Sequence, residues 1–453
     1  MERLFGVPHG DVYRHLAALL AKAGRLAETN TVMTMLKESE LFDMLRRDAP
    51  VDPRRSLIAL NGAEAAWQGQ GDDILREMAA LEEDSPVEHA ALPKRRAAAE
   101  RRFGQWLDHA DYRCTPEETP TEGAHAGLSA LGARVGLLQI LPGPHSLFLL
   151  LTTTEFQISR EVGVGEAALR RLVVEFRAAV QAQSEGAEAM AKALYSYLIA
   201  PVAEIYRELG IKTLLIAAEG AVRYLPFAAL YDGEKFLAET TATALLTEAI
   251  PYAAAPRSEQ ATIAAFAAAG LEEEVRRLMR EAARGGNNPG KASYEAEFCQ
   301  PGLAEGLASH QFIHIAGRLA LDARRPADSV LHLGDGTTMP LPEFSSGRFY
   351  FRDVAMVALT VCDTEPARGG DGREVEGLGA LLRWCRAEAV MATLWPPAAD
   401  GPARLVASFY AFRRDGRAPA MALNMAQRKV LEAGSGFRHP YYWANYFVMG
   451  GIE

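Results

Sequence analysis

Apolar residues at three- and four-residue spacing dominate the first part of the chain. Between positions 15 and 45 they form one face of amphipathic helices: Leu16, Leu19, Leu20, Leu26, Val32, Met35, Leu36, Leu41 and Leu45. Gly24 interrupts this pattern, so the stretch predicts two helices joined by a short turn. One such pair cannot bury its own apolar face and therefore needs a neighbour. Further helical patterns cover 64–81 and 93–107.

The pattern changes after a break at 111–126 that contains Pro116, Pro120 and Gly123. Two short apolar runs, 133–141 and 146–154, flank a Pro-Gly-Pro turn and predict a β-hairpin. Beyond them, helices are predicted at 164–184, 187–209 and 402–414, and strands at 212–217, 312–316, 354–361 and 389–394. This alternation of strands and helices predicts an α/β fold, with a mostly parallel sheet and helices on both of its faces.

Composition and charge narrow the classes of function. The 453 residues are 49% hydrophobic with a net charge of -10, which argues against a protein that binds nucleic acid electrostatically. The apolar stretch at 135–151 is broken by prolines and is shorter than the roughly 20 residues that span a bilayer. The four cysteines form no C-x-x-C pair, and no metal-ligand spacing is present. We therefore expect a cytoplasmic protein without a metal, a cofactor, a membrane partner or a nucleic-acid partner.

Cys362 is the first candidate for chemistry. It follows the apolar run 354–361 and precedes a glycine-rich loop, so it lies where a sheet presents reactive residues. A cysteine nucleophile also needs a base, usually a histidine, and the predicted neighbouring strand 312–316 carries His314. A lone cysteine after a strand is more often a small buried hydrophobe, so composition alone leaves both interpretations open.

The residues around Cys362 resemble the CHAT domains, which are caspase-like cysteine peptidases of the separase and caspase clan. Leu359-Thr360-Val361-Cys362-Asp363-Thr364 is similar to the family's Leu-Ser-Ala-Cys-x-Thr motif. Further segments match the family in its order: Val222–Leu230, Glu376–Leu378, Val390–Pro396, Phe409-Tyr410, Ala426-Gln427 and His439–Ala444. The resemblance implies a caspase-like domain over 128–453. The helical pair resembles the tetratricopeptide-type (TPR) repeat that often precedes such a domain, so we expect a TPR-like helical region at 1–110 and a linker at 111–127.

The sequence departs from the family at the catalytic histidine. The family's strand ends His-x-Ala-Thr-His-Gly, in which the second histidine is the general base and the glycine helps to form the oxyanion hole. Here the strand reads His314-Ile315-Ala316-Gly317-Arg318-Leu319. Arg318 therefore takes the position of the histidine and Leu319 that of the glycine. Arg318 precedes Cys362 by 44 residues, which fits the family's layout.

No other histidine is a good substitute for the missing base. An arginine stays protonated in proteins and cannot accept a proton. His314 lies four residues before Arg318, about 13 Å along a strand, whereas a base needs contact at roughly 3 Å. We expect it to be a buried strand histidine. His310 is further away, and His439 belongs to the family's structural tail.

These departures predict a catalytically impaired CHAT protein. It would act as a regulatory or peptide-binding pseudo-peptidase in a bacterial proteolytic or defence pathway. Its partner would be a protein or peptide, with an active paralogue or an upstream activator among the alternatives. The competing hypothesis is an active cysteine endopeptidase, with Cys362 as nucleophile and a base not yet identified. Arg318 would favour the Cys362 thiolate under either hypothesis.

Overall fold

The computed structural model describes residues 9–45, 98, 101–102, 127–132, 134–247, 262–284, 290–351, 353–363, 370–396 and 402–450. The chain divides into two compact units, one made of 1–12 with 48–118 and the other of 13–47 with 119–453. The first unit lies almost wholly outside the described residues, and so do the helices predicted at 64–81 and 93–107 and the linker predicted at 111–127. The domain boundaries at 110 and 128 therefore stay predictions, and everything below concerns the second unit.

The second unit begins with the helical pair that the sequence predicts. Helix α1 (His9–Lys22) and helix α2 (Leu26–Leu45) are joined by a tight turn at Gly24, whose φ of 73° is in the left-handed region that favours glycine. The side chains of Leu20, Val32 and Leu36 are buried, as the three- and four-residue spacing requires.

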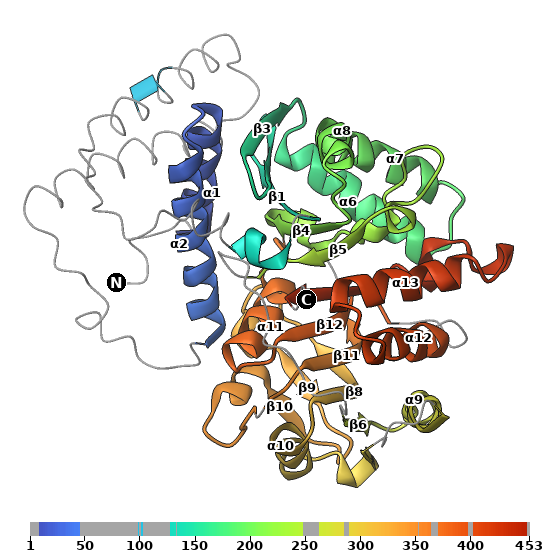
Figure 1. Ribbon diagram of the computed structural model, residues 1–453. Coiled ribbons are helices and arrows are strands. Elements are labelled where there is room, and N and C mark those ends of the chain that lie inside the picture. Colours follow the sequence, from blue (N-terminus) through green and yellow to red (C-terminus); the bar gives the residue numbers. More distant parts are fainter. Residues whose placement is uncertain are drawn as a thin grey trace, which may run out of the picture. The chain divides into compact units, whose positions relative to one another are not determined.

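A single sheet of 13 strands runs through the described part of the unit (Figure 1). Its main path has the order β10-β9-β8-β11-β12-β13-β5-β4-β1-β2-β3, and β6 pairs with β7 and β8. The strands are β1 (Val135–Pro142), β2 (Leu147–Thr152), β3 (Gln157–Val162), β4 (Thr213–Ala218), β5 (Ala242–Leu245), β6 (Ile263–Ala267), β7 (Lys291–Tyr294), β8 (Phe312–Ala320), β9 (Val330–His332), β10 (Thr338–Pro340), β11 (Met356–Asp363), β12 (Ala389–Thr393) and β13 (Tyr446–Gly450). Strands β7, β6, β8, β11 and β12 are parallel neighbours, and antiparallel β13 follows β12. The fold is thus a mostly parallel α/β sheet, as predicted.

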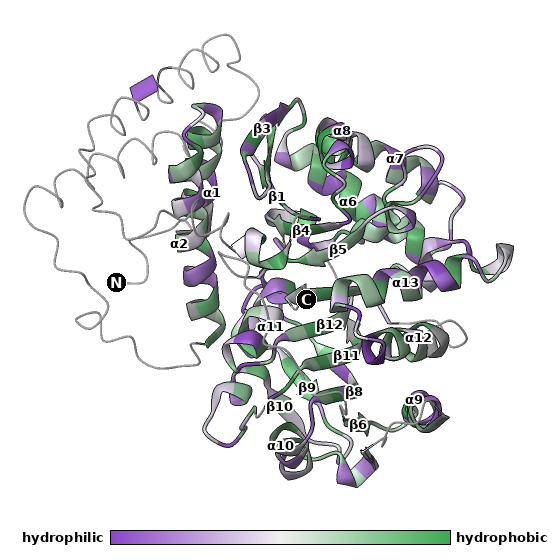
Figure 2. Ribbon diagram, viewed as in Figure 1, coloured by the Kyte–Doolittle hydropathy of each residue, from purple (hydrophilic) through white to green (hydrophobic). Residues whose placement is uncertain are grey.

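Helices cover both faces of this sheet. They are α6 (Glu166–Gln181), α7 (Ala187–Leu198), α8 (Ala200–Glu208), α9 (Glu272–Arg284), α10 (Gln300–Ser309), α11 (Arg373–Trp384), α12 (Pro402–Arg414) and α13 (Pro419–Leu431). Figure 1 shows α12 and α13 side by side, and α12 also packs against α9. In Figure 2 the central strands are mainly green and purple gathers on the outer helices, because parallel strands are buried on both faces.

Two predicted elements differ in extent from the structure. The helical pattern at 187–209 forms two helices, α7 and α8, which meet at Ile199 because Pro201 lacks an N–H and cannot continue a helix in its interior. The strand predicted at 312–316 continues to Ala320, because β11 and β9 flank its second half. None of the described helices combines the length and the apolar character that crossing a membrane requires.

Candidate active site

The structure brings the predicted site residues to one edge of the sheet. Strands β8 and β11 are parallel neighbours, so their carboxyl ends meet there. Val361 pairs with Arg318 and Cys362 pairs with Leu319, after a shift of register between Leu359 and Val361. Arg318 and Cys362 are therefore diagonal neighbours, with Cα atoms about 6 Å apart at ordinary strand spacing.

Arg318 and Leu319 have opposite environments. The side chain of Arg318 is exposed, whereas that of Leu319 is fully buried in the main hydrophobic core. Leu319 also has a register partner on each side, Cys362 in β11 and Leu331 in β9, so its main chain lies inside the sheet. The position that the family gives to an oxyanion-hole glycine is here a core position.

His314 is remote from Cys362 and occupied by other contacts. It pairs in register with Ala358, four residues before Cys362, and its side chain is fully buried. Its Nδ1 lies 3.2 Å from the Tyr410 hydroxyl of α12, and its Nε2 lies 3.0 Å from Oε1 of Glu274 of α9. The prediction of a buried strand histidine is confirmed. These contacts tie β8 to the two helices.

His439 also has a structural contact. It precedes a short 3-10 helix (Pro440–Tyr442), and its Nδ1 accepts a hydrogen bond from the Tyr441 N–H. This capping contact agrees with a structural role in the tail of the domain.

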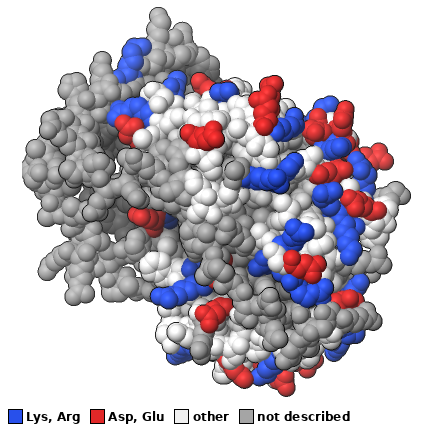
Figure 3. All heavy atoms as spheres, in the orientation of Figure 1, with Lys and Arg blue, Asp and Glu red and all other residues white. Residues whose placement is uncertain are grey.

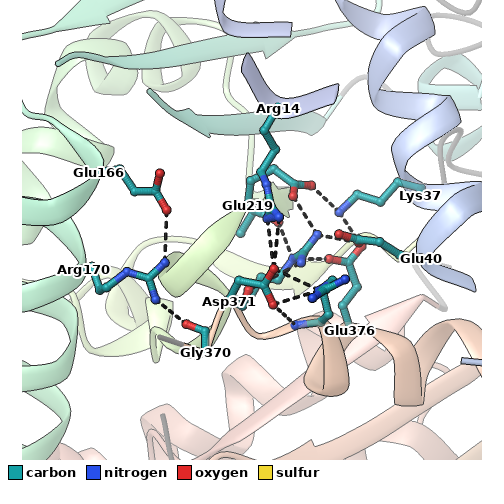
Figure 4. Close-up of polar contacts among 12 residues, drawn as sticks. Arg14, Lys37, Glu40, Glu166, Arg170, Glu219, Gly370, Asp371 and Glu376 are labelled. Atoms are coloured by element: carbon teal, nitrogen blue, oxygen red, sulfur yellow. Dashed lines mark hydrogen bonds and ion pairs between the residues drawn. The ribbon is translucent and has the colours of Figure 1, made fainter. Parts of the chain in front are cut away.

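A cluster of buried charges lies where α2, the start of α11 and the segment after β4 meet (Figure 4). At its centre Nζ of Lys37 lies 2.6 Å from Oε1 of Glu219 and 2.5 Å from Oε1 of Glu376. Arg223, in the 3-10 helix Gly220–Tyr224, binds the same two carboxylates at 2.7 and 2.6 Å and reaches Glu40 of α2 at 2.7 Å. Each of these side chains is at least nine-tenths buried, so every charge depends on its partners.

The same cluster includes the residues just before α11. Asp371 forms ion pairs with Arg14 of α1 at 3.1 Å and with Arg373 of α11 at 3.0 Å. One residue earlier, the carbonyl oxygen of Gly370 accepts a hydrogen bond of 2.5 Å from Arg170 of α6. The sequence suggests a flexible surface loop at 369–372, but Asp371 is largely buried and fixed by charges from several elements.

Gly372 is required by this geometry. Its φ is 74°, and a Cβ atom there would lie 2.5 Å from Cβ of Arg223. Any other residue would be strained and would also displace an arginine that holds three carboxylates.

The charges shift one another's pKa values. Burial raises the pKa of Glu40 to about 7; the attraction of Arg223 opposes this shift, and repulsion by the Glu219 carboxylate adds to it. For Asp371, burial opposes ionisation, but Arg223, Arg14 and Arg373 outweigh it and lower the pKa. Burial also opposes the charge of Arg223, yet Glu219, Glu376 and Glu40 raise its pKa well above the ordinary value. Asp371 and Arg223 are therefore charged around neutral pH, whereas Glu40 gains or loses its proton there.

A second buried contact joins two of the sequence segments that resemble the family, 222–230 and 390–396. Arg177 of α6 donates to the Leu394 carbonyl oxygen at 2.8 Å and stacks on the rings of Tyr224 and Trp395. The Tyr224 hydroxyl in turn donates to Oε1 of Glu374 at 2.5 Å. Segments 222–230 and 390–396 thus meet at Arg177, and the ion pair between Arg223 and Glu376 joins segment 376–378 to the first of them.

Sequence reasoning missed the charged cluster. Its members come from positions 14 to 376, and isolated charges on predicted helices are usually solvent-exposed. The local signals are the Lys37/Glu40 and Glu219/Arg223 spacings of three and four residues, which place each pair on one side of a helical turn. Among the described residues, no group of three His, Cys, Asp or Glu side chains could hold a metal ion.

A sequence model of the CHAT domain matches residues 188–451, which is more than half of the chain. A search of curated proteins finds no match. Two crystal structures of the Saccharomyces cerevisiae separase–securin complex, at 3.0 and 2.6 Å resolution, resemble this chain with TM-scores of 0.46 and 0.41. Each is 8% identical to it over 96% of this chain and 37% of the separase-complex chain. This chain therefore corresponds to about a third of the chains that it resembles. On the strength of the family match, the chain belongs to the CHAT domain family.

Proposed function

We propose that this protein is a CHAT-family, caspase-like protein with strongly impaired amide hydrolysis, and that it acts by binding a protein or peptide. The observation that carries the proposal is the pairing of β8 with β11. It puts Arg318 and Leu319 beside Val361 and Cys362, at the positions where the family has its histidine and glycine.

The first support is that β8 places no base in register with the end of β11. The register partners of Val361, Cys362 and Asp363 are Arg318, Leu319 and Ala320, and none of them accepts a proton. The nearest histidine along β8 is His314, whose two ring nitrogens already contact Tyr410 and Glu274. General acid–base catalysis is worth about 10²–10⁴ in rate, so its loss alone is severe.

The second support is Leu319. Its side chain is buried and its main chain is paired on both sides, so this segment fits a sheet interior better than an oxyanion hole. Loss of one oxyanion donor costs about 10²–10³ in rate in a well-studied protease. Together the two departures should reduce peptide cleavage to a trace.

A site without peptidase activity could still bind a partner protein or peptide. The edge where β8 and β11 end presents the exposed guanidinium of Arg318, which is suited to a carboxylate on a partner. Basic and acidic side chains of the described residues are interspersed over the face shown in Figure 3, so this face presents no large patch of one charge. We further propose that this binding serves a bacterial proteolytic or defence pathway in the cytoplasm, with an active paralogue or an upstream activator as the partner.

One observation favours an active cysteine endopeptidase as the second candidate. Cys362 keeps the family's nucleophile position at the carboxyl end of β11, beside the end of β8. Under this alternative Cys362 is the nucleophile and a residue not yet identified supplies the base.

A thiol titration combined with a cleavage assay distinguishes the two candidates. Wild-type protein and Cys362→Ala are incubated with a pooled peptide library, and alkylation of Cys362 is followed across pH by mass spectrometry. The proposal expects no cleavage that depends on Cys362, at any pH at which the protein is folded. Cleavage present in wild type and absent in Cys362→Ala would establish the active alternative.

A further inference from the structure

The sheet has two halves, β1–β5 and β6–β13, which meet at a seam between β5 and β13. In the described part of the chain these two parallel strands pair in register at one position, through Met449 and Leu245. By contrast, β5 pairs with β4 at four positions, and β13 pairs with β12 at five. The strand ladder therefore holds each half together more firmly than it holds the halves to each other.

The two strands diverge on one side of this pair and leave a cavity. The parallel register would continue with Ala244 opposite Val448, but the pairing stops short of them. Residues 243–245 of β5 and 446–448 of β13 instead line a cavity of about 20 Å³, which has room for about one water molecule. Leu394, which directly follows β12, also lines it. Since β12 ends beside β11, the seam is open at the edge of the sheet that carries the candidate site.

Three of the segments that resemble the family border this cavity. They are 222–230, 390–396 and 439–444, which contribute Leu225–Ala228, Leu394 and Ala444. Cys362 and its register partner lie in other segments. What these three segments share in the fold is thus the seam.

Helix α13, red in Figure 1, packs against both strands of the seam. Its Asn424 and Gln427 are buried and lie three residues apart, so they project from the same face of the helix. The side chain of Asn424 reaches the β1–β5 half. Its Nδ2 donates hydrogen bonds to the carbonyl oxygens of Ala238 and Thr241, just before β5, at 2.6 and 3.2 Å.

The side chain of Gln427 reaches the β6–β13 half in the same way. Its Nε2 donates to the carbonyl oxygens of Trp443 and Tyr446, at the start of β13, both at 3.2 Å. Each amide nitrogen thus uses its two hydrogens on two carbonyl groups. The four accepting residues are at most 3% exposed, so water cannot easily take the place of either amide.

We propose that α13 is a clasp for the two halves of the sheet, and that Asn424 and Gln427 are the positioning residues that fix the width of the seam. The inference goes beyond the proposed function and does not depend on whether a peptide is cleaved. With both amides in place, the single strand pair is reinforced from the helix. Without either amide, the halves part at the seam and the cavity takes up water, while the strand pairs within each half persist. The seam is therefore a hinge.

Hydrogen–deuterium exchange of the full chain, read by mass spectrometry of its peptides, tests this inference. Asn424→Leu and Gln427→Met keep the approximate volume of each side chain and remove its donors. Because a clasp couples the two halves, each variant should raise exchange about tenfold or more in both β5 and β13, the factor that corresponds to loss of two ordinary hydrogen bonds. Exchange in β1 and β2 should stay unchanged.

Val430→Ala is the matched control, because it removes buried apolar volume from the same helix and keeps both amides. A rise confined to β5 in Asn424→Leu and to β13 in Gln427→Met would reveal two separate local anchors and overturn the clasp. A rise no greater than that in Val430→Ala would overturn it as well. If either variant does not fold, Asn424→Ser or Gln427→Asn, with a polar group on a shorter side chain, replaces it and carries the same expectation.

Discussion

Replacement of Lys37 by methionine tests how much the buried cluster contributes to stability. Methionine keeps most of the apolar stem and removes the ammonium that lies 2.6 Å from Glu219 and 2.5 Å from Glu376. The side chains of these two carboxylates are 0% and 8% exposed, so water cannot replace the lost cation without a rearrangement. Only Arg223 would then be shared among Glu219, Glu376 and Glu40.

The size of the effect follows from the uncompensated charge. Breaking a buried ion pair by removal of one partner costs about 3–5 kcal/mol, because the other charge stays buried. At roughly 2 °C per kcal/mol for a large domain, the melting temperature should fall by about 6–10 °C. Glu376→Gln in the same chain removes one of the unpaired charges, so the double variant should recover part of this loss.

Differential scanning calorimetry at neutral pH, with denaturant unfolding, provides the measurement. Lys22→Met, an exposed lysine on α1, is the control and should change the free energy of unfolding by no more than about 0.5 kcal/mol. If Lys37→Met is as stable as this control, the cluster is solvated in solution and the reasoning fails. If the double variant is less stable than Lys37→Met by the full cost of Glu376→Gln alone, the two residues are not coupled.

Two further predictions concern the same cluster. The folded-state pKa of Glu40 is raised to about 7 from 4.5, so the stability that its proton contributes is fully present below pH 4.5 and is lost as the pH rises through about 7. Glu40→Gln should therefore flatten the pH dependence of the free energy of unfolding between about pH 5 and 8, by about 1–3 kcal/mol. An unchanged pH dependence in denaturant titrations of this variant would contradict the raised pKa. Gly372→Ala should destabilise the protein by about 2 kcal/mol or more, because alanine there would combine a left-handed φ with a clash against Arg223. Gly434→Ala is the control, since Gly434 also has a positive φ but has open space around its Cβ position. Equal melting temperatures for the two variants would contradict the close approach of Gly372 to Arg223.

Local sequence patterns were enough to predict the framework of the fold. The continuous apolar run that becomes β11 has no polar face, which is typical of a strand buried between parallel neighbours. The break between α1 and α2 follows from Gly24. The break between α7 and α8 was missed, although Pro201 was visible, because the apolar periodicity continues across it. The short strands β9 and β10 have too few residues to show a period and depend on their neighbours.

The site was predicted in part, for a physical reason. Cys362 could be placed at a strand end because it follows an apolar run, whereas Arg318 was assigned to the neighbouring strand end through the resemblance of its segment to the family's motif. The charged cluster could not be predicted, because Lys37 and Glu376 become partners only when α2 packs on α11. From the sequence alone a charged residue is expected to be exposed to solvent, because the sequence does not show which residue of opposite charge the fold brings beside it.

Restoration of the family's residues at the edge of β8 tests the central claim most directly. Arg318→His with Leu319→Gly would supply the base and the small residue that this chain lacks, with Arg318→His alone and the double variant in Cys362→Ala as controls. The account predicts no peptide cleavage by the wild type, and a gain in the double variant that disappears without Cys362. Wild-type cleavage that depends on Cys362, and that is unchanged or lowered in the double variant, would contradict it.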